Sequence, residues 1–139
     1  MLRRSVATAL ALALALAACG ESKEDKAQKT VCSARADIKA QVDELRGLSV
    51  TTATLDGVRA NLKAIRDSLA KIATAQGDLT GARKQEAQKA TQTFKSEVSG
   101  VTRELVTSVS LADGKQQIRA ALDGLASSYR AAFAPLDCS

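Results

Sequence analysis

The feature that most constrains the fold is the spacing of apolar residues between positions 55 and 72. Six large aliphatic side chains recur there in alternating steps of three and four: Leu55, Val58, Leu62, Ile65, Leu69 and Ile72. Because an α-helix makes one turn every 3.6 residues, this spacing puts all six on one stripe of a helix. Such a stripe indicates a helix packed against other helices, and Gly77 is its predicted C-terminal stop.

Three further segments repeat the helical spacing. The first covers residues 31–45, ends before Gly47, and has its stripe at Val31, Ala34, Ile38, Val42 and Leu45. The next runs over residues 81–109, with its stripe at Ala87, Ala90, Phe94, Val98, Val101 and Leu105. The last covers residues 110–133, with its stripe at Ile118, Leu122, Leu125, Tyr129 and Phe133. No segment shows sustained alternation with a period of two, so strands are not expected.

Local signals suggest where these helices begin and end. Residues 49–54 and 77–81 are predicted to be interhelical turns. Ser110-Leu111-Ala112-Asp113 resembles a capping box and predicts that the last helix begins at Ser110, while Pro135 closes it. Gly100 lies inside the third segment and suggests a kink or a close helix approach. Four helices joined by short loops predict an all-α, up-down four-helix bundle.

The first eighteen residues differ from the rest of the chain. Arg3 and Arg4 precede an Ala- and Leu-rich run of 13 residues, from Val6 to Ala18, and acidic and basic residues follow at once. A membrane-spanning helix needs about 20 apolar residues, so this run is too short to be one. The pattern is that of a cleavable signal peptide. The residues after the arginine pair match a twin-arginine signal poorly, which favours general secretion.

The end of this segment, Leu16-Ala17-Ala18-Cys19, resembles the lipobox of bacterial lipoproteins. In that family the cysteine receives a diacylglycerol group and becomes the first residue after cleavage. The resemblance implies that Cys19 is lipidated, and that the chain is exported and held to a cell membrane or envelope by the lipid. The alternative is that Cys19 is a small apolar residue within the signal peptide. The resemblance covers the signal region, and residues 20–139 resemble no characterised family.

The signal peptide and the helical segments divide the chain into three predicted parts. Residues 1–18 are the predicted signal peptide, 19–29 the lipidated cysteine and its tether, and 30–139 the helical bundle domain. Residues 20–29 carry no large apolar side chain, so we expect a solvated tether or a frayed first turn. About 120 residues then remain, which is enough for one domain.

Two cysteines besides Cys19 lie near the two ends of the predicted bundle. In an oxidising compartment, Cys32 and Cys138 are expected to form a disulfide. In an up-down bundle the start of the first helix and the end of the fourth share one end, which brings the two cysteines together. The alternative is that these thiols are free or bonded to another molecule.

Charge and composition exclude several classes of function. Without the signal peptide, the chain has 18 basic and 15 acidic residues, and the two kinds are interleaved along the sequence. Nucleic-acid binding is therefore not expected, because it needs a concentrated basic surface or several aromatic platforms. The chain has no histidine, which removes histidine-dependent nucleophiles and metal sites. We expect no enzyme activity, no metal and no cofactor.

Two functional hypotheses remain. The first is a non-catalytic envelope lipoprotein whose bundle is a binding or structural module for an envelope protein or an anionic cell-wall polymer. The alternative is a carrier that holds a small apolar ligand between segments 81–109 and 110–133. For that carrier the candidate slot residues are Phe94, Tyr129 and Phe133, which are otherwise ordinary core residues.

Overall fold

A computed structural model describes residues 21–48, 55–108 and 112–138 of the protein. They form four α-helices and one short 3-10 helix: α1 (Lys23–Gly47), α2 (Leu55–Ala75), η2 (Gln76–Asp78), α3 (Gly81–Ser108) and α4 (Gly114–Phe133). Within these three ranges there is no strand. The prediction of an all-α fold is confirmed.

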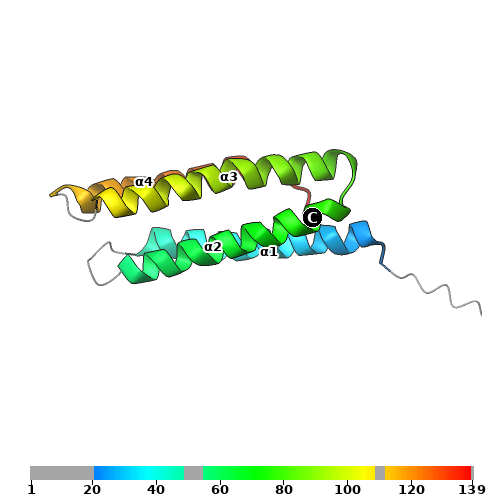
Figure 1. Ribbon diagram of the computed structural model, residues 1–139, viewed down its shortest axis with the longest axis horizontal. Helices are drawn as coiled ribbons and strands as arrows, with labels where there is room; N and C mark the ends of the chain where they lie inside the picture. Colours follow the sequence, from blue (N-terminus) through cyan, green and yellow to red (C-terminus); the bar gives the residue numbers. More distant parts are fainter. Residues whose placement is uncertain (1–20, 49–54, 109–111, 139) are drawn as a thin grey trace, which may run out of the picture.

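The helices run alternately up and down along one long axis (Figure 1). The most extensive packing joins α1 to α2 and α3 to α4, and these two hairpins lie against each other through α2–α3 and α1–α4. The start of α1, the η2 turn and the C-terminal segment therefore share one end of the bundle. The predicted up-down four-helix bundle, closed by a disulfide, is confirmed.

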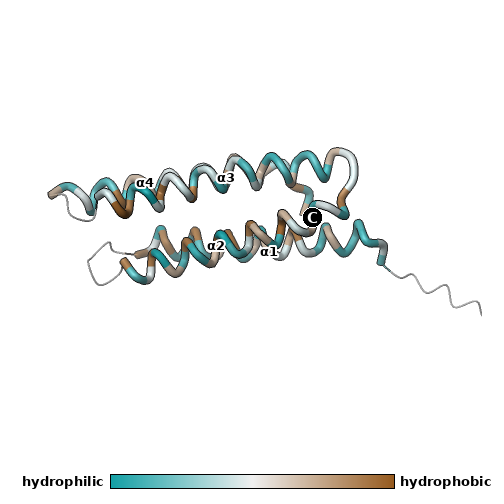
Figure 2. Tube along the Cα trace, viewed as in Figure 1, coloured by the Kyte–Doolittle hydropathy of each residue, from teal (hydrophilic) through white to brown (hydrophobic). Residues whose placement is uncertain are grey.

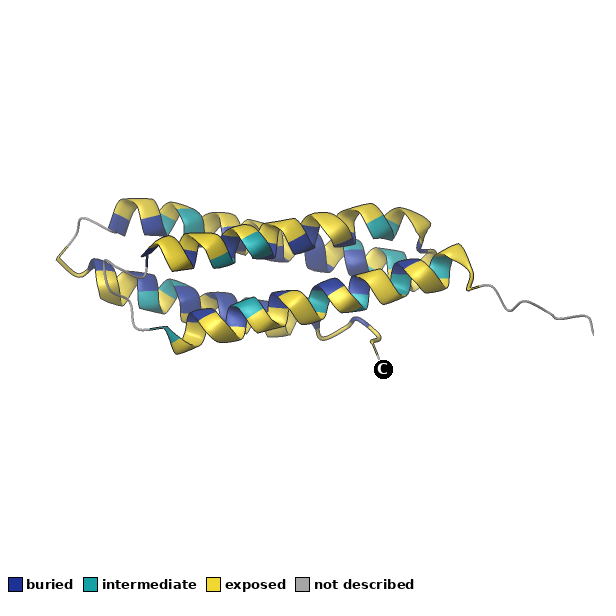
Figure 3. Cartoon of the chain, turned by 90° about the horizontal axis from the view of Figure 1, so that it is seen from below, coloured by how far each residue is buried: buried dark blue, intermediate teal, exposed yellow. Residues whose placement is uncertain are grey.

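The core is made by the apolar stripes predicted from the sequence. Every stripe residue is at most 8% exposed, and Ile65, Phe94 and Phe133 are completely buried. Apolar and polar positions alternate around each helix (Figure 2), and the buried positions line the sides that face the other helices (Figure 3). Leu79 and Leu136, which belong to no predicted helix, are also buried and close the core at the disulfide end.

The tether prediction is wrong for residues 23–29, which belong to α1. The Ser22 side chain accepts a hydrogen bond from the backbone N–H of Asp25 at 3.1 Å and so caps the helix. Glu24 and Asp25 lie in the first turn, where negative charge stabilises the helix dipole. Ala27 is only 5% exposed. Residues 23–29 are helical without a large apolar side chain because the Ser22 cap, the acidic first turn and the burial of Ala27 stabilise these turns.

The predicted start of α4 also needs correction. The helix begins at Gly114, with Asp113 at the N-cap position and no side-chain capping bond. Residues 110 and 111 of the predicted capping box lie outside the described part of the chain. A Cβ atom on Gly114 would lie 1.7 Å from the backbone oxygen of Ser108. The first turn of α4 thus lies directly against the end of α3, which only glycine permits.

Gly100, by contrast, is not a site of close helix approach. A Cβ atom there would meet no other atom within 4 Å, and α3 is an unbroken helix across this position. The expectation of a close helix approach at Gly100 is therefore wrong.

The two glycines predict opposite effects of the same substitution. We expect Gly114→Ala to lower the free energy of unfolding by about 1–3 kcal/mol, because the backbone must shift to relieve the overlap. We expect Gly100→Ala to raise it by about 0.5–1 kcal/mol, because alanine is the better helix former. Urea-induced unfolding followed by circular dichroism measures both. Equal effects would contradict the close contact at Gly114.

Candidate functional site at the disulfide end of the bundle

Cys32 and Cys138 form a disulfide, as predicted. The S–S distance is 2.07 Å and the Cα atoms are 5.5 Å apart. Cys32 lies nine residues after the start of α1, so the bond is set back from the end of that helix by about 13 Å. Cys138 is reached by a short segment after Phe133, and the buried side chain of Leu136 holds that segment against the core. The Arg35 guanidinium donates a hydrogen bond to the Leu136 carbonyl at 3.3 Å.

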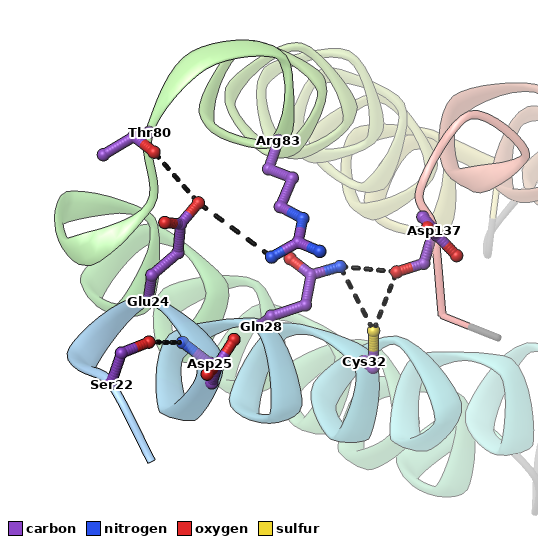
Figure 4. A network of polar contacts seen from close by, with 8 residues as sticks. All are labelled: Ser22, Glu24, Asp25, Gln28, Cys32, Thr80, Arg83 and Asp137. Carbon is purple, nitrogen blue, oxygen red and sulfur yellow. Dashed lines mark hydrogen bonds and ion pairs between the residues drawn. The ribbon is translucent and has the colours of Figure 1, made fainter. Parts of the chain in front are cut away.

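A polar network joins three segments at this end (Figure 4). The Thr80 hydroxyl, in the turn between α2 and α3, donates to the Glu24 carboxylate of α1 at 2.9 Å. Arg83 of α3 lies 3.9 Å from the same carboxylate. The Gln28 side-chain amide donates to the backbone oxygen of Asp137. These contacts fix the first two turns of α1 to the α2–α3 turn and to the C-terminal segment.

Beside this network, α1 and α2 form an open groove of about 580 Å³. Its lining includes the small side chains of Ala27, Ala70 and Ala75 and the charged side chains of Lys23, Lys26, Lys71, Asp67 and Asp78. A hydrogen bond from Lys63 at 2.8 Å lowers the pKa of Asp67, so this carboxylate stays ionised at neutral pH. Shallow, mixed in charge and lined by small residues, the groove suits a polar polymer or a helix better than a buried small molecule.

A second groove, of about 430 Å³, lies between α3 and α4 toward the opposite end. Its charged residues are Glu97 and Glu104, and Gly100, Ala120 and Gly124 keep it open. The buried Ser108 hydroxyl lies within hydrogen-bonding distance of the Glu104 carboxylate, at 2.6 Å. This groove is acidic, whereas the α1–α2 groove carries three lysines. Neither was predicted, although the small residues outside the apolar stripes are the signal that could have indicated them.

The three candidate slot residues are brought together, but they pack on one another. Phe94 meets Tyr129 and Phe133 edge-on, with ring centroids 5.8 and 5.4 Å apart, and the Tyr129 and Phe133 centroids are 5.0 Å apart. The Tyr129 hydroxyl donates to the backbone oxygen of Arg35 at 3.1 Å. Burial raises the pKa of Tyr129, although nearby Arg35 acts in the opposite direction, so the hydroxyl remains a donor at neutral pH. The rings fill the place where the carrier hypothesis puts a ligand.

Among residues 21–48, 55–108 and 112–138, no three His, Cys, Asp or Glu side chains gather as metal ligands. None of the helices in these ranges has the length and hydropathy needed to cross a bilayer. Cys19 and the lipobox precede the described residues.

Comparison with family models, curated proteins and solved structures gives no match to this chain.

Proposed function

We propose that the chain is a non-catalytic, lipid-anchored protein of the cell envelope, and that its disulfide-closed bundle is a binding module. The observation that carries this proposal is the position of α1, which begins at Lys23, four residues after Cys19. Three residues separate the lipobox cysteine from the helix, and they can span at most about 10 Å. A lipid on Cys19 would therefore hold the disulfide end of the bundle against the membrane surface.

This arrangement would place the α1–α2 groove close to the membrane. The groove begins beside Lys23 and Lys26, in the first turn of α1, and extends to Asp67. A helix of an envelope protein or a strand of anionic wall polymer could lie along it, with its acidic groups near the three lysines. The attraction would weaken with salt, because charges at an open surface are screened over about 10 Å at 0.1 M salt.

The anchor is tested by the substitution Cys19→Ser. We expect the wild-type protein in the membrane fraction, with a diacylglycerol mass on its N-terminal peptide, and Cys19→Ser in the aqueous fraction. Cys32→Ser is the matched control, because it removes a cysteine without touching the lipobox, and it should stay with the membrane. Recovery of Cys19→Ser in the membrane fraction would contradict the anchor.

The binding role is tested separately by cross-linking in cells. We expect a photo-reactive residue at Thr74, beside the groove, to give a reproducible cross-linked protein or wall fragment. The same residue at Ser99, on the exposed side of α3, is the control. Reversing Lys26 and Lys71 to Glu should abolish the product from Thr74. If Thr74 gives no product, or both sites give the same product, the groove is not the binding surface.

A further inference from the structure

The fold separates the basic side chains of α3 from the acidic ones. The three glutamates of this helix are Glu86, Glu97 and Glu104. At about 100° of rotation per residue, they lie within about 20° of one another around the helix. Glu97 and Glu104 line the groove beside α4, so this acidic side of α3 faces α4. Lys84 and Lys95 each precede a glutamate by two residues, which puts them about 160° away, on the other side of the helix.

The basic side of α3 lies beside a basic side of α2. Lys95 and Arg66 line the same shallow hollow between the two helices, and both are exposed. Arg59 precedes Arg66 by seven residues, which is about two turns, so it lies on the same side of α2. From Lys84 to Arg103 this surface extends about 28 Å along α3. We call it the basic face, and its members are Arg59, Lys63, Arg66, Lys84, Lys95 and Arg103.

The ion pairs on the basic face neutralise only part of its charge. The Arg59 guanidinium lies 3.2 Å from the Asp56 carboxylate, and the Lys63 ammonium lies 2.8 Å from the Asp67 carboxylate. The other four basic residues of the face form no ion pair within the described ranges. The chain after the predicted signal peptide has a net charge of +3. The net positive charge of the protein is thus concentrated on this face.

We infer that the basic face binds a flexible polyol-phosphate chain. Positive charges spread over about 28 Å fit a chain of repeated anions, because a single small anion reaches only one or two of them. Arginine guanidinium groups also match phosphate oxygens with paired N–H donors. The inference goes beyond the proposed function, since it concerns a surface other than the α1–α2 groove and does not depend on the lipid anchor.

The absence of aromatic side chains from this face favours a polymer without nucleobases. The aromatic residues of the whole chain are Phe94, Tyr129 and Phe133, and all three are buried. Proteins that bind single-stranded nucleic acids stack the bases on exposed aromatic rings, each worth about 1–3 kcal/mol. A phosphate backbone is therefore the part of a polymer that this face can recognise.

Synthetic poly(glycerol phosphate) is the probe. Full-length protein in phosphatidylcholine nanodiscs is titrated with the fluorescently labelled polymer, and its anisotropy is followed. We expect saturable binding that weakens about fiftyfold between about 50 and 200 mM salt, because four phosphate contacts on a flexible chain give a logarithmic slope of about −3. Monomeric glycerol phosphate should not compete at equal phosphate concentration. The absence of saturable binding at low salt, or equal competition by the monomer, would overturn the inference.

Paired variants test which surface holds the polymer. Arg66→Gln with Lys95→Gln should weaken binding at least about tenfold at low salt and make the salt slope shallower by about 1.4. The matched control is Arg130→Gln with Lys115→Gln, which makes the same change in net charge on α4 and should bind as the wild type does. If both pairs lose affinity equally, or if Arg66→Gln with Lys95→Gln binds as the wild type does, the inference is wrong. The cross-linking test of the α1–α2 groove is unaffected by that result.

Single-stranded DNA of the same length separates a polyol phosphate from a nucleic acid. We expect it to bind no more tightly than the polymer, because bases gain nothing from this face. Binding of DNA at least about tenfold tighter than that of the polymer would assign the face to nucleic acid and overturn the inference.

Discussion

Replacing Cys32 with serine is expected to lower the free energy of unfolding by about 4–5 kcal/mol under oxidising conditions. The disulfide joins residues 106 positions apart, and closing a loop of about 100 residues restricts the unfolded chain by that amount in the chain-entropy description. The folded state loses little else, because Cys138 lies on a short segment that Leu136 still anchors in the core. Urea-induced unfolding followed by circular dichroism measures the change.

Three comparisons isolate the bond from other effects of the substitution. Cys138→Ser should cost as much as Cys32→Ser, and the double variant no more than either one, because each removes the same bond. In a reducing buffer that opens the disulfide, wild-type protein and Cys32→Ser should unfold at the same urea concentration. A difference between them that persists under reducing conditions would assign the loss to side-chain packing of Cys32 instead.

Phe94→Ala is expected to lower the free energy of unfolding by about 3–5 kcal/mol. Phe94 is completely buried, and its ring meets both Tyr129 and Phe133 edge-on at 5.8 and 5.4 Å. Truncation removes these contacts and leaves a cavity between α3 and α4 that a helix backbone cannot collapse to fill. The same unfolding experiment measures the loss.

Val106→Ala is the control for this prediction. Val106 lies on the same helix but is 64% exposed, so its truncation should change the stability by less than about 0.5 kcal/mol. A loss below about 1 kcal/mol for Phe94→Ala would show that the aromatic cluster is not packed as core. That result would favour the carrier hypothesis, in which these rings line a ligand slot.

Much of the fold could be predicted because the apolar stripes repeat at the helical period. All six apolar residues of the stripe from Leu55 to Ile72 were predicted from their spacing alone, and all six are buried. The pairing of Cys32 with Cys138 was expected because they are the two cysteines outside the lipobox of an exported chain. The up-down topology, inferred separately from the short connections, supports it by bringing them to one end. The helix ends were harder. Ser22 caps α1 well before the first large apolar residue, and the start of α4 depends on a contact with Ser108 that no local signal announces.

Less of the candidate sites than of the fold could be predicted from the sequence. The basic face combines charges that are interleaved with acidic residues in the sequence, and only the packing of α2 against α3 brings them together. The α1–α2 groove is lined by both Lys26 and Asp67, which are 41 positions apart in the sequence. Phe94, Tyr129 and Phe133 were grouped correctly by their stripes. Their stripes could not indicate whether the rings would line a slot or fill it.

The sequence by itself determined the number of helices, the faces that they bury and the end at which the disulfide closes the bundle. These properties depend on periodicity, on loop length and on residue type, all of which are local. The tertiary structure alone decided where α1 and α4 begin, how Leu79 and Leu136 close the core, and which grooves stay open. Those features arise from the distances between helices, which depend on the sizes of side chains that meet across the core and are far apart in the chain.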